Sequence, residues 1–307
     1  MDKQGFDWPV KPMEPVTRKE VFDSADTVFQ VKWDGVRVLS YVFADKSIRL
    51  YNRRLNERTL QYPEVSQALS KLEPLTVLDG EIVALGANGK PDFPLVLQRD
   101  LMRMPSKIRY TASRIPVYYM VFDILWLDGK AVFKLPMSER LLILEKMDFG
   151  QSVMQHVDST KGAGKALFEA VRAEGLEGIV AKKMDSPYHI GKKTDTWQKI
   201  KCLRQLEAAV GGYIAEGKRF KSLLLGIPHA SGLLYIGAAA SGVTQKQWNA
   251  LGSVFADSCW PCPFVNPPDT AGARWVLPKV HVSVRFLEYT KSGLMRAPAI
   301  AGFLEKI

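Results

Sequence analysis

The stretch "KWDGVR" places a lysine, an aspartate, a glycine and an arginine within six positions, between runs rich in valine and aromatic residues. Asp-Gly between two strand-like runs is a strong hairpin signal, so the pattern predicts a tight turn with exposed charges. It also allows a second interpretation, in which Lys32 is a nucleophile at the rim of a sheet. A lysine amine attacks only in its neutral form, so this role requires burial or positive neighbours that favour that form.

Candidates for these neighbours occur further along the chain. "WQKIK" supplies Lys199 and Lys201, which lie two residues apart on a predicted strand and therefore face the same side. "LDGEIV" and "EGIVAKK" each place one carboxylate, Glu81 and Glu177, beside a glycine in an apolar strand. Two carboxylates with three lysines and Arg37 are the residue types that bind a metal-bound polyphosphate. These residues therefore predict a phosphate-handling site.

The first two-thirds of the chain supplies the elements that must position these residues. Runs rich in β-branched and aromatic residues alternate with helical patterns, which predicts an α+β domain with a mixed, largely antiparallel sheet and helices packed outside. The predicted strands are residues 27–34, 37–43, 75–85, 115–125 and 177–183, and the predicted helices are residues 62–72, 93–104, 138–147 and 164–175.

The pattern changes near Cys202. From there on, short strands are broken by glycine pairs and Ser-Gly turns, with one helical pattern over residues 244–255. Such spacing is typical of a small β-barrel. We therefore predict two domains, residues 1–202 and residues 203–307.

Composition limits the class of partner. Lys and Arg number 42 against 32 Asp and Glu, giving a formal net charge of +10. This excess favours a polyanionic partner, with nucleic acid ahead of an acidic membrane surface, although a solvated basic surface has the same composition. No apolar run is long enough to span a bilayer, and the N-terminus lacks a secretory pattern, so we expect a cytoplasmic protein with no membrane partner. The "CWPC" pair lacks a second pair or a nearby histidine, which favours a structural role over a zinc site.

Seven motifs occur in a recognisable order: "KWDGVR", "YNRRLNERT", "LDGEIVAL", "VFDILWLDG", "EGIVAKK", "WQKIK" and "RFLEYTKSGLMRAP". The set resembles the ATP-dependent DNA ligases of the lysine nucleotidyltransferase superfamily, over residues 10–300. The C-terminal motif resembles the ligase domain of bacterial non-homologous end-joining ligases most closely. The resemblance implies a nucleotidyltransferase domain of ATP-grasp-like antiparallel sheets with helices, followed by an all-β OB-fold domain.

The resemblance also implies roles for residues that bind the nucleotide. Lys32 matches the lysine that takes AMP from ATP, and Gln30 the position that often reads the adenine edge. Arg37 and Arg53 match the arginines that bind the nucleotide ribose and the 5′-phosphate of a nick. Phe122 matches the aromatic residue stacked on adenine, although an aromatic in "YYMVFDIL" is more commonly a core residue.

A second group of implied roles concerns the metal and the phosphates. Glu81 matches the carboxylate near the ribose and the metal, and Glu177 the metal-binding glutamate. Lys199 and Lys201 match the lysines on the α-phosphate, and Lys182 shares a motif with Glu177 as a nucleotide-binding residue.

The last motif departs from the pattern of many ligases. Arg296 in "LMRAP" fills its first arginine position, but Ala299 follows Pro298 where many ligases have a second arginine. The resemblance implies that this motif, with Arg296, contacts the leaving pyrophosphate.

The implied cofactors are ATP as AMP donor and Mg²⁺, with Mn²⁺ as a substitute. The implied partner is nicked double-stranded DNA, with a Ku-like end-binding protein as a further hypothesis, and we expect a monomer associated with the nucleoid. The chain begins at the catalytic domain, which indicates a minimal ligase or one that depends on partners. Two alternatives remain: an RNA ligase or capping-type guanylyltransferase of the same superfamily, and a non-catalytic DNA-binding relative.

Overall fold

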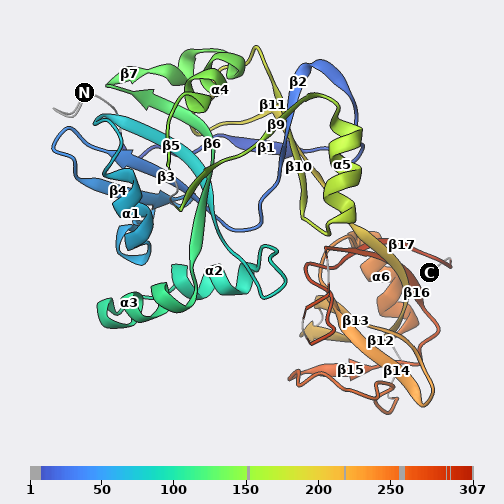
Figure 1. Ribbon diagram of the computed structural model, residues 1–307. Coiled ribbons are helices and arrows are strands. Elements are labelled where there is room, and N and C mark those ends of the chain that lie inside the picture. Colours follow the sequence, from blue (N-terminus) through green and yellow to red (C-terminus); the bar gives the residue numbers. More distant parts are fainter. Residues whose placement is uncertain are drawn as a thin grey trace. The chain divides into compact units, whose positions relative to one another are not determined.

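The computed structural model describes residues 8–150, 153–217, 219–255, 260–287, 289–290 and 292–305. The chain divides into two compact units, Met1–Cys202 and Leu203–Ile307 (Figure 1). Within the described residues, no helix combines the length and the apolar character needed to cross a bilayer.

The larger unit contains two sheets that are antiparallel at most of their strand pairs. The five-stranded sheet has the order β1-β11-β10-β2-β9, and only its β1–β11 pair is parallel among the described strands. Its strands are β1 (Glu14–Thr17), β2 (Ser24–Val31), β9 (Ser159–Gly162), β10 (Gly178–Lys183) and β11 (Lys193–Lys201).

The second sheet of this unit has the order β4-β3-β5-β6-β7, with β8 added alongside β6 in parallel. Its strands are β3 (Val36–Val42), β4 (Ile48–Asn52), β5 (Thr76–Ala84), β6 (Val117–Leu127), β7 (Lys130–Ala131) and β8 (Met154–His156). The helical segments of the unit are η1 (Thr59–Gln61), α1 (Pro63–Leu69), α2 (Phe93–Asp100), α3 (Pro105–Arg114), η2 (Val132–Lys134), α4 (Met137–Glu145) and α5 (Gly164–Ala173).

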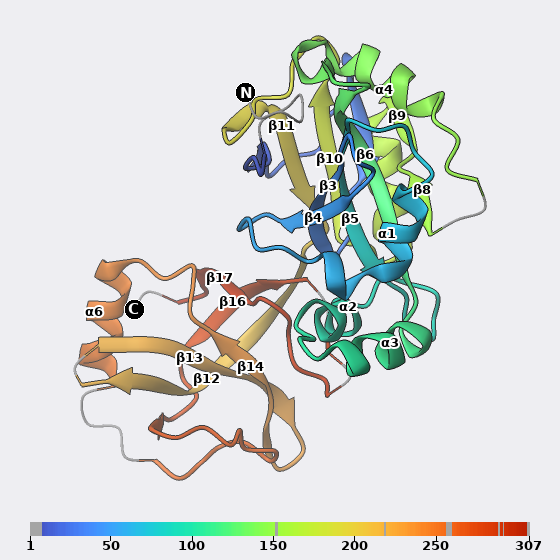
Figure 2. The ribbon, with the colours of Figure 1, turned by 90° about the vertical axis from the view of Figure 1, so that its left-hand side faces the viewer.

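Alternating side chains divide the interior of the larger unit into layers. On β2, Val28 packs in the core between the two sheets, whereas its neighbour Phe29 packs against α5 on the other side. This is the two-residue period of a strand that is buried on both faces. The outer face of the six-stranded sheet is covered by α1, α2 and α4, through Val65, Val96 and Leu144. The layers are therefore helices, sheet, sheet and α5 (Figures 1 and 2).

The "KWDGVR" segment does not form the predicted hairpin. β2 ends at Val31 and β3 begins at Val36, but β2 pairs with β10 and β9, and β3 pairs with β4 and β5. The turn therefore carries the chain from one sheet to the other. A Cβ at Gly35 would lie 2.2 Å from the Ile82 carbonyl oxygen, so only glycine allows this close crossing. The prediction of a turn is right, and the prediction of paired flanking strands is wrong.

A buried ion pair fixes α4 to the edge of this layer structure. The guanidinium of Arg140 donates to both carboxylate oxygens of Asp123 on β6, at 2.7 and 2.9 Å, and both side chains are fully buried. Arg140 also donates to the carbonyl oxygens of Leu135 and Ser186, so its charge is well satisfied. Loss of one partner from such a pair typically costs about 3–5 kcal/mol. Asp123 thus has a structural role immediately after Phe122.

In its described residues, the smaller unit is a curved sheet with one helix. The sheet order is β14-β13-β12-β16-β17, with β15 beside β12. A parallel bridge between Ser241 and Ala299 joins the two ends of this order, where the Ile300 N–H donates to the Ser241 carbonyl at 2.9 Å, so the sheet closes into a barrel. The elements are β12 (Arg204–Glu216), β13 (Arg219–His229), β14 (Gly232–Ala239), α6 (Gln245–Val254), β15 (Ala273–Trp275), β16 (His281–Phe286) and β17 (Ala299–Phe303).

Candidate active site

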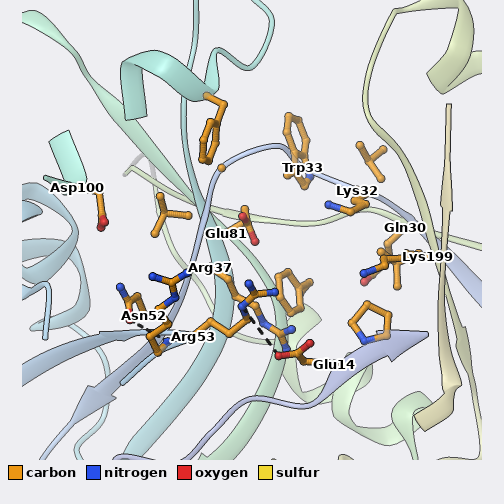
Figure 3. A pocket seen from close by; sticks show the side chains of 18 of the residues that line it. Glu14, Gln30, Lys32, Trp33, Arg37, Asn52, Arg53, Glu81, Asp100 and Lys199 are labelled. Carbon is orange, nitrogen blue, oxygen red and sulfur yellow. Dashed lines mark hydrogen bonds and ion pairs between the residues drawn. The ribbon is translucent and has the colours of Figure 1, made fainter. Parts of the chain in front are cut away.

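The two sheets of the larger unit enclose a pocket of about 560 Å³ (Figure 3). Its walls come from both sheets, from the "KWDGVR" turn and from α2. Most of the residues singled out in the sequence line it: Gln30, Lys32, Arg37, Arg53, Glu81, Phe122, Lys182 and Lys199. These positions are separated by up to 169 residues in sequence, so it is tertiary folding that brings their side chains together in the pocket.

Strand register brings the lysines together. Val180 on β10 pairs with Gln30 on one side and with Lys199 on the other. Two residues along, the Lys32 N–H donates to the Gly178 carbonyl at 2.8 Å, and Gly178 pairs with Lys201. Since residues two apart on a strand share a face, the three lysines lie on the same face of one sheet, and Lys32 and Lys199 line the pocket.

Glu177 connects two of these lysines. Its carboxylate contacts the Lys32 amine through one oxygen and the Lys201 amine, at 3.0 Å, through the other. Burial raises the pKa of Glu177, but the two lysines more than offset this, and the pKa lies below its ordinary value. Glu177 is therefore ionised at neutral pH. Glu177 and Lys201 do not themselves line the pocket, but they contact it through Lys32.

Glu81 has a contrasting environment. It lies opposite Arg37 in the β3–β5 pair and lines the pocket. Burial raises its pKa to about 8, although Lys32 and Arg37 act in the opposite direction. Within the described part of the chain, no hydrogen bond or ion pair reaches this carboxylate. A partly buried carboxyl group without such a partner, close to the ionised Glu177, fits a divalent cation, because Mg²⁺ prefers oxygen ligands.

Arg37 is held from behind by a carboxylate that the sequence did not single out. Its guanidinium donates to both oxygens of Asp79, at 3.0 and 2.6 Å, and Asp79 also accepts from the Tyr188 hydroxyl at 2.7 Å. Burial alone would lower the pKa of Arg37, but the Asp79 carboxylate raises it, so the cation persists in the pocket. The bidentate pair fixes the plane of the guanidinium.

Lys182 is almost completely buried beneath two aromatic rings. Its ammonium lies 4.0 Å from the Trp197 ring centroid and 4.6 Å from that of Phe122, and it donates to the Phe122 carbonyl oxygen at 3.0 Å. Burial lowers the pKa of Lys182 to about 7, against the opposing effect of Asp123 and Asp79. The rings of Phe122 and Trp197 meet edge to face at 6.1 Å. Lys182 therefore fixes the position of Phe122 at the pocket wall.

The lowered pKa of Lys182 predicts a pH-dependent stability difference. Between about pH 7 and pH 10.5 the unfolded chain holds more protons on this lysine than the folded chain, so stability rises with pH across that window. Lys182→Met lacks the titrating amine, so this contribution to the rise of stability with pH is absent from the variant. We expect the free energy of unfolding of the wild-type chain, relative to that of Lys182→Met, to rise with pH across this window, by up to about 1.4 kcal/mol per pH unit. Thermal unfolding of both proteins across the window measures it, and a constant difference contradicts the prediction.

Gln30 combines two features of a base-reading residue. It is almost fully buried, and its amide nitrogen donates to Ser159 Oγ at 2.9 Å and, more weakly, to the Val157 carbonyl at 3.5 Å. Because the Val157 carbonyl oxygen can only accept a hydrogen bond, the Gln30 amide nitrogen, and not its oxygen, must face Val157. The amide oxygen is buried without a partner. A ligand that brings an N–H donor would satisfy it.

Lys199 and Arg53 are more exposed members of the pocket lining. The pKa of Lys199 is lowered, first by burial and then by the positive charges of Lys201 and Lys32. Arg53 follows β4 and lies 4.0 Å from the Glu14 carboxylate, with more than half of its side chain exposed. Both side chains can therefore reorient toward an anionic ligand.

One predicted site residue, Arg296, and the "CWPC" pair lie outside this constellation. Arg296 belongs to the smaller unit, where its carbonyl accepts from the Leu287 N–H at 3.1 Å, and its role stays a prediction. The first cysteine of the "CWPC" pair, Cys259, lies outside the described residues, and Cys262 is a free, exposed thiol.

Three contributors to the site were missed. Asp79 and Tyr188 hold Arg37, and Trp197 covers Lys182. Asp79 had a usable signal, because it lies two residues before Glu81 on a strand and shares its face. Tyr188 had none, since it lies in an irregular segment between β10 and β11.

Comparisons with known proteins agree on one family. The ATP dependent DNA ligase domain model matches residues 11–201, and the ATP dependent DNA ligase C terminal region model matches residues 216–305. The multifunctional non-homologous end joining protein LigD of Mycolicibacterium smegmatis is 34% identical over 284 residues, which is 89% of this chain and 35% of that protein. The chain thus spans about a third of the length of this relative.

A shorter relative and a solved structure extend the comparison. The SPbeta prophage-derived DNA ligase-like protein LigB of Bacillus subtilis is 32% identical over 211 residues, covering 69% of this chain and 74% of that protein. The structure of mycobacterial DNA ligase D complexed with ATP and MES is 27% identical, with a TM-score of 0.56 over 98% of this chain and 97% of that chain.

Proposed function

This chain belongs to the ATP-dependent DNA ligase family, and from that premise we propose that Lys32 takes AMP from ATP and that the AMP is used to seal nicks in DNA. The observation that carries the proposal is the Lys32–Glu177–Lys201 contact at the edge of a pocket that also contains Glu81. It combines a nucleophile, a charge that orients it and further cations in one place, as phosphoryl transfer requires.

The reaction begins with a phosphoramidate bond. A new bond forms between Lys32 Nζ and the α-phosphorus of ATP, and the bond from that phosphorus to the pyrophosphate oxygen breaks. Glu177 orients the amine, and because its lowered pKa makes it a weak base, the amine releases its proton to water before it attacks. AMP then passes to the 5′-phosphate of the nick, and the 3′-hydroxyl displaces AMP.

Each transfer places negative charge on non-bridging phosphate oxygens, so the remaining cations act mainly through electrostatics. We assign Lys199 to the α-phosphate, because it lines the same face as Lys32. We assign Arg37 and Arg53 to the ribose and to the 5′-phosphate of the nick. Glu81 and Glu177 would hold Mg²⁺ or Mn²⁺, which supplies charge neutralisation at the phosphates when bound.

We place the base beside Gln30 and Phe122, which both line the pocket. We propose that Phe122 stacks on adenine, with Lys182 fixing its position, and that the amide oxygen of Gln30 accepts from the adenine 6-amino group. Guanine presents a carbonyl oxygen at the corresponding position, which would face the Gln30 acceptor. The orientation that Ser159 and Val157 give to this amide therefore supports ATP over GTP.

The charge distribution and the smaller unit support DNA as the acceptor. The net charge of +10 suits a phosphate backbone, and the β-barrel resembles OB-folds that bind nucleic acid. We propose that Arg296 of this unit contacts the leaving pyrophosphate. Similarity to LigD proteins supports a role in DNA repair at the nucleoid, with a Ku-like protein as a candidate partner.

Sealing of a singly nicked duplex, with and without ATP, tests the proposed function. We expect an AMP-labelled protein from ATP and Mg²⁺, followed by ATP-dependent sealing. Labelling by GTP in preference to ATP would indicate a guanylyltransferase, and sealing of RNA in preference to DNA would indicate an RNA ligase. Absence of both labelling and sealing would indicate a non-catalytic relative.

Removing the charge of Lys199 should slow the formation of the AMP adduct. We expect Lys199→Gln to lower the single-turnover rate by about 10²-fold or more, because the variant has one cation fewer facing the α-phosphate. Lys193→Gln is the matched control, since Lys193 is an exposed lysine on the same strand β11. Equal rates in the two variants would remove the α-phosphate role from Lys199.

A further inference from the structure

A strongly basic segment projects from the larger unit at α3. Residues 101–116, "LMRMPSKIRYTASRIP", contain four basic residues and no acidic one. α3 buries only Ile108, while Arg103, Lys107, Arg109 and Arg114 are all exposed. We refer to these four residues and Tyr110 as the α3 face. In Figures 1 and 2, α3 lies at the end of the unit beside α2, away from the layered sheets.

Interactions within the unit do not account for this charge. Arg114 donates to the Tyr110 hydroxyl, with its guanidinium 5.4 Å from that ring. Among the described residues, no carboxylate forms an ion pair with any of the four basic side chains. Four like charges in one short segment repel one another, and an opposing anion would relieve that repulsion.

The α3 face follows directly in sequence on residues that line the pocket. Four residues of α2 and its C-terminal cap line the pocket: Phe93, Leu97, Asp100 and Leu101. Arg103 follows Leu101 by two residues and begins the basic segment. Asp100 at the end of α2 is the acidic residue nearest to this segment in sequence. Its carboxylate oxygen Oδ1 pairs with Nε of Arg58 at 3.0 Å, so its charge is compensated. The basic side chains of the α3 face therefore begin two residues beyond the pocket lining, with no uncompensated acidic residue between them.

We propose that the α3 face binds the phosphate backbone of the duplex on one side of the nick. This inference rests on the proposed nick-sealing function. A helix of 10 residues is about 15 Å long, which spans about four base pairs at about 3.4 Å each. Tyr110, 62% exposed, adds a hydroxyl and an aromatic ring between the basic side chains. DNA fits this surface better than a protein partner does, because a nick in the pocket must continue into duplex beside it.

A quadruple variant tests the proposal on the full chain. Arg103, Lys107, Arg109 and Arg114 are changed to glutamine, which removes the charge and keeps a similar helix propensity. The matched control changes Lys130, Lys134, Lys146 and Lys161 to glutamine. These are also exposed residues of the larger unit, on β7, η2, the end of α4 and β9. Circular dichroism and thermal unfolding establish that both variants fold.

Affinity for a singly nicked duplex is then measured over a series of salt concentrations. We expect the α3 variant to bind more weakly, with a slope of log affinity against log salt that is shallower by up to about 3.6, at about 0.9 for each phosphate that the variant no longer neutralises. The control should change the slope much less. Labelling of Lys32 by ATP without DNA should match that of the wild-type chain, because the α3 face lies outside the pocket.

The outcomes separate this inference from the proposed function. If the wild-type chain is not labelled by ATP and does not seal the nick, the proposed function is wrong, and the inference that rests on it is wrong as well. If it seals and the α3 variant binds nicked duplex as the wild type does, the α3 face serves another partner and the inference is wrong. Equal reductions in affinity in the α3 and control variants would also overturn it, because net charge alone would then explain the binding.

Discussion

Replacing Lys32 by arginine should abolish the covalent AMP adduct while leaving the fold intact. Arginine keeps the positive charge that contacts Glu177, so the ion pair at the pocket edge survives. Its guanidinium stays protonated and is not a nucleophile under these conditions. We therefore expect the rate of labelling by ATP to fall by at least about 10⁴-fold, the scale on which an enzyme loses activity with its nucleophile.

The measurement is single-turnover labelling with α-labelled ATP, followed by denaturation to retain only covalent adduct. Lys161→Arg is the control, because Lys161 is an exposed lysine on β9 of the same sheet. A nick that already carries AMP on its 5′-phosphate bypasses Lys32, so Lys32→Arg should seal it at close to the wild-type rate. Full labelling of Lys32→Arg would show that another residue is the nucleophile.

Local patterns predicted the general plan of the chain well. The fold class is confirmed, with a mixed-sheet nucleotidyltransferase unit followed by a barrel of the OB type. The resemblance to end-joining ligases is also confirmed. Strands such as β5 and β10 were recognisable because buried strands carry continuous β-branched runs. α3 was missed because a helix with one buried residue shows no apolar stripe.

What the patterns did not predict depends on tertiary pairing. Asp-Gly between two strand-like runs predicted a hairpin, but the flanking strands pair in different sheets. Turn chemistry specifies a reversal or bend and leaves the partner of each strand open. Because the turn crosses between sheets, Lys32 lies where the pocket opens rather than at an isolated hairpin tip. Asp79 was missed for a related reason, since its partner Arg37 lies 42 residues earlier in the chain.

Replacing Glu177 by glutamine should slow labelling less than replacing Lys32 does, but it should also impair the sealing step. The carboxylate contacts the amines of both Lys32 and Lys201, and it is one of the two proposed metal ligands. A neutral amide leaves two neighbouring ammonium groups without their shared anion. We expect labelling by ATP to fall by about 10³-fold, the upper range for removing one electrostatic interaction from an active site.

The nick that already carries AMP distinguishes the two roles of Glu177. If Glu177 acted only by orienting Lys32, Glu177→Gln would seal that nick normally, as we expect of Lys32→Arg. Since we also assign it to the metal, we expect sealing to be impaired and to respond to higher Mg²⁺ or Mn²⁺ concentrations. Glu169→Gln, which changes an exposed glutamate on α5, is the control. Normal sealing by Glu177→Gln would leave Glu177 an orienting residue for Lys32 and remove it from the metal site.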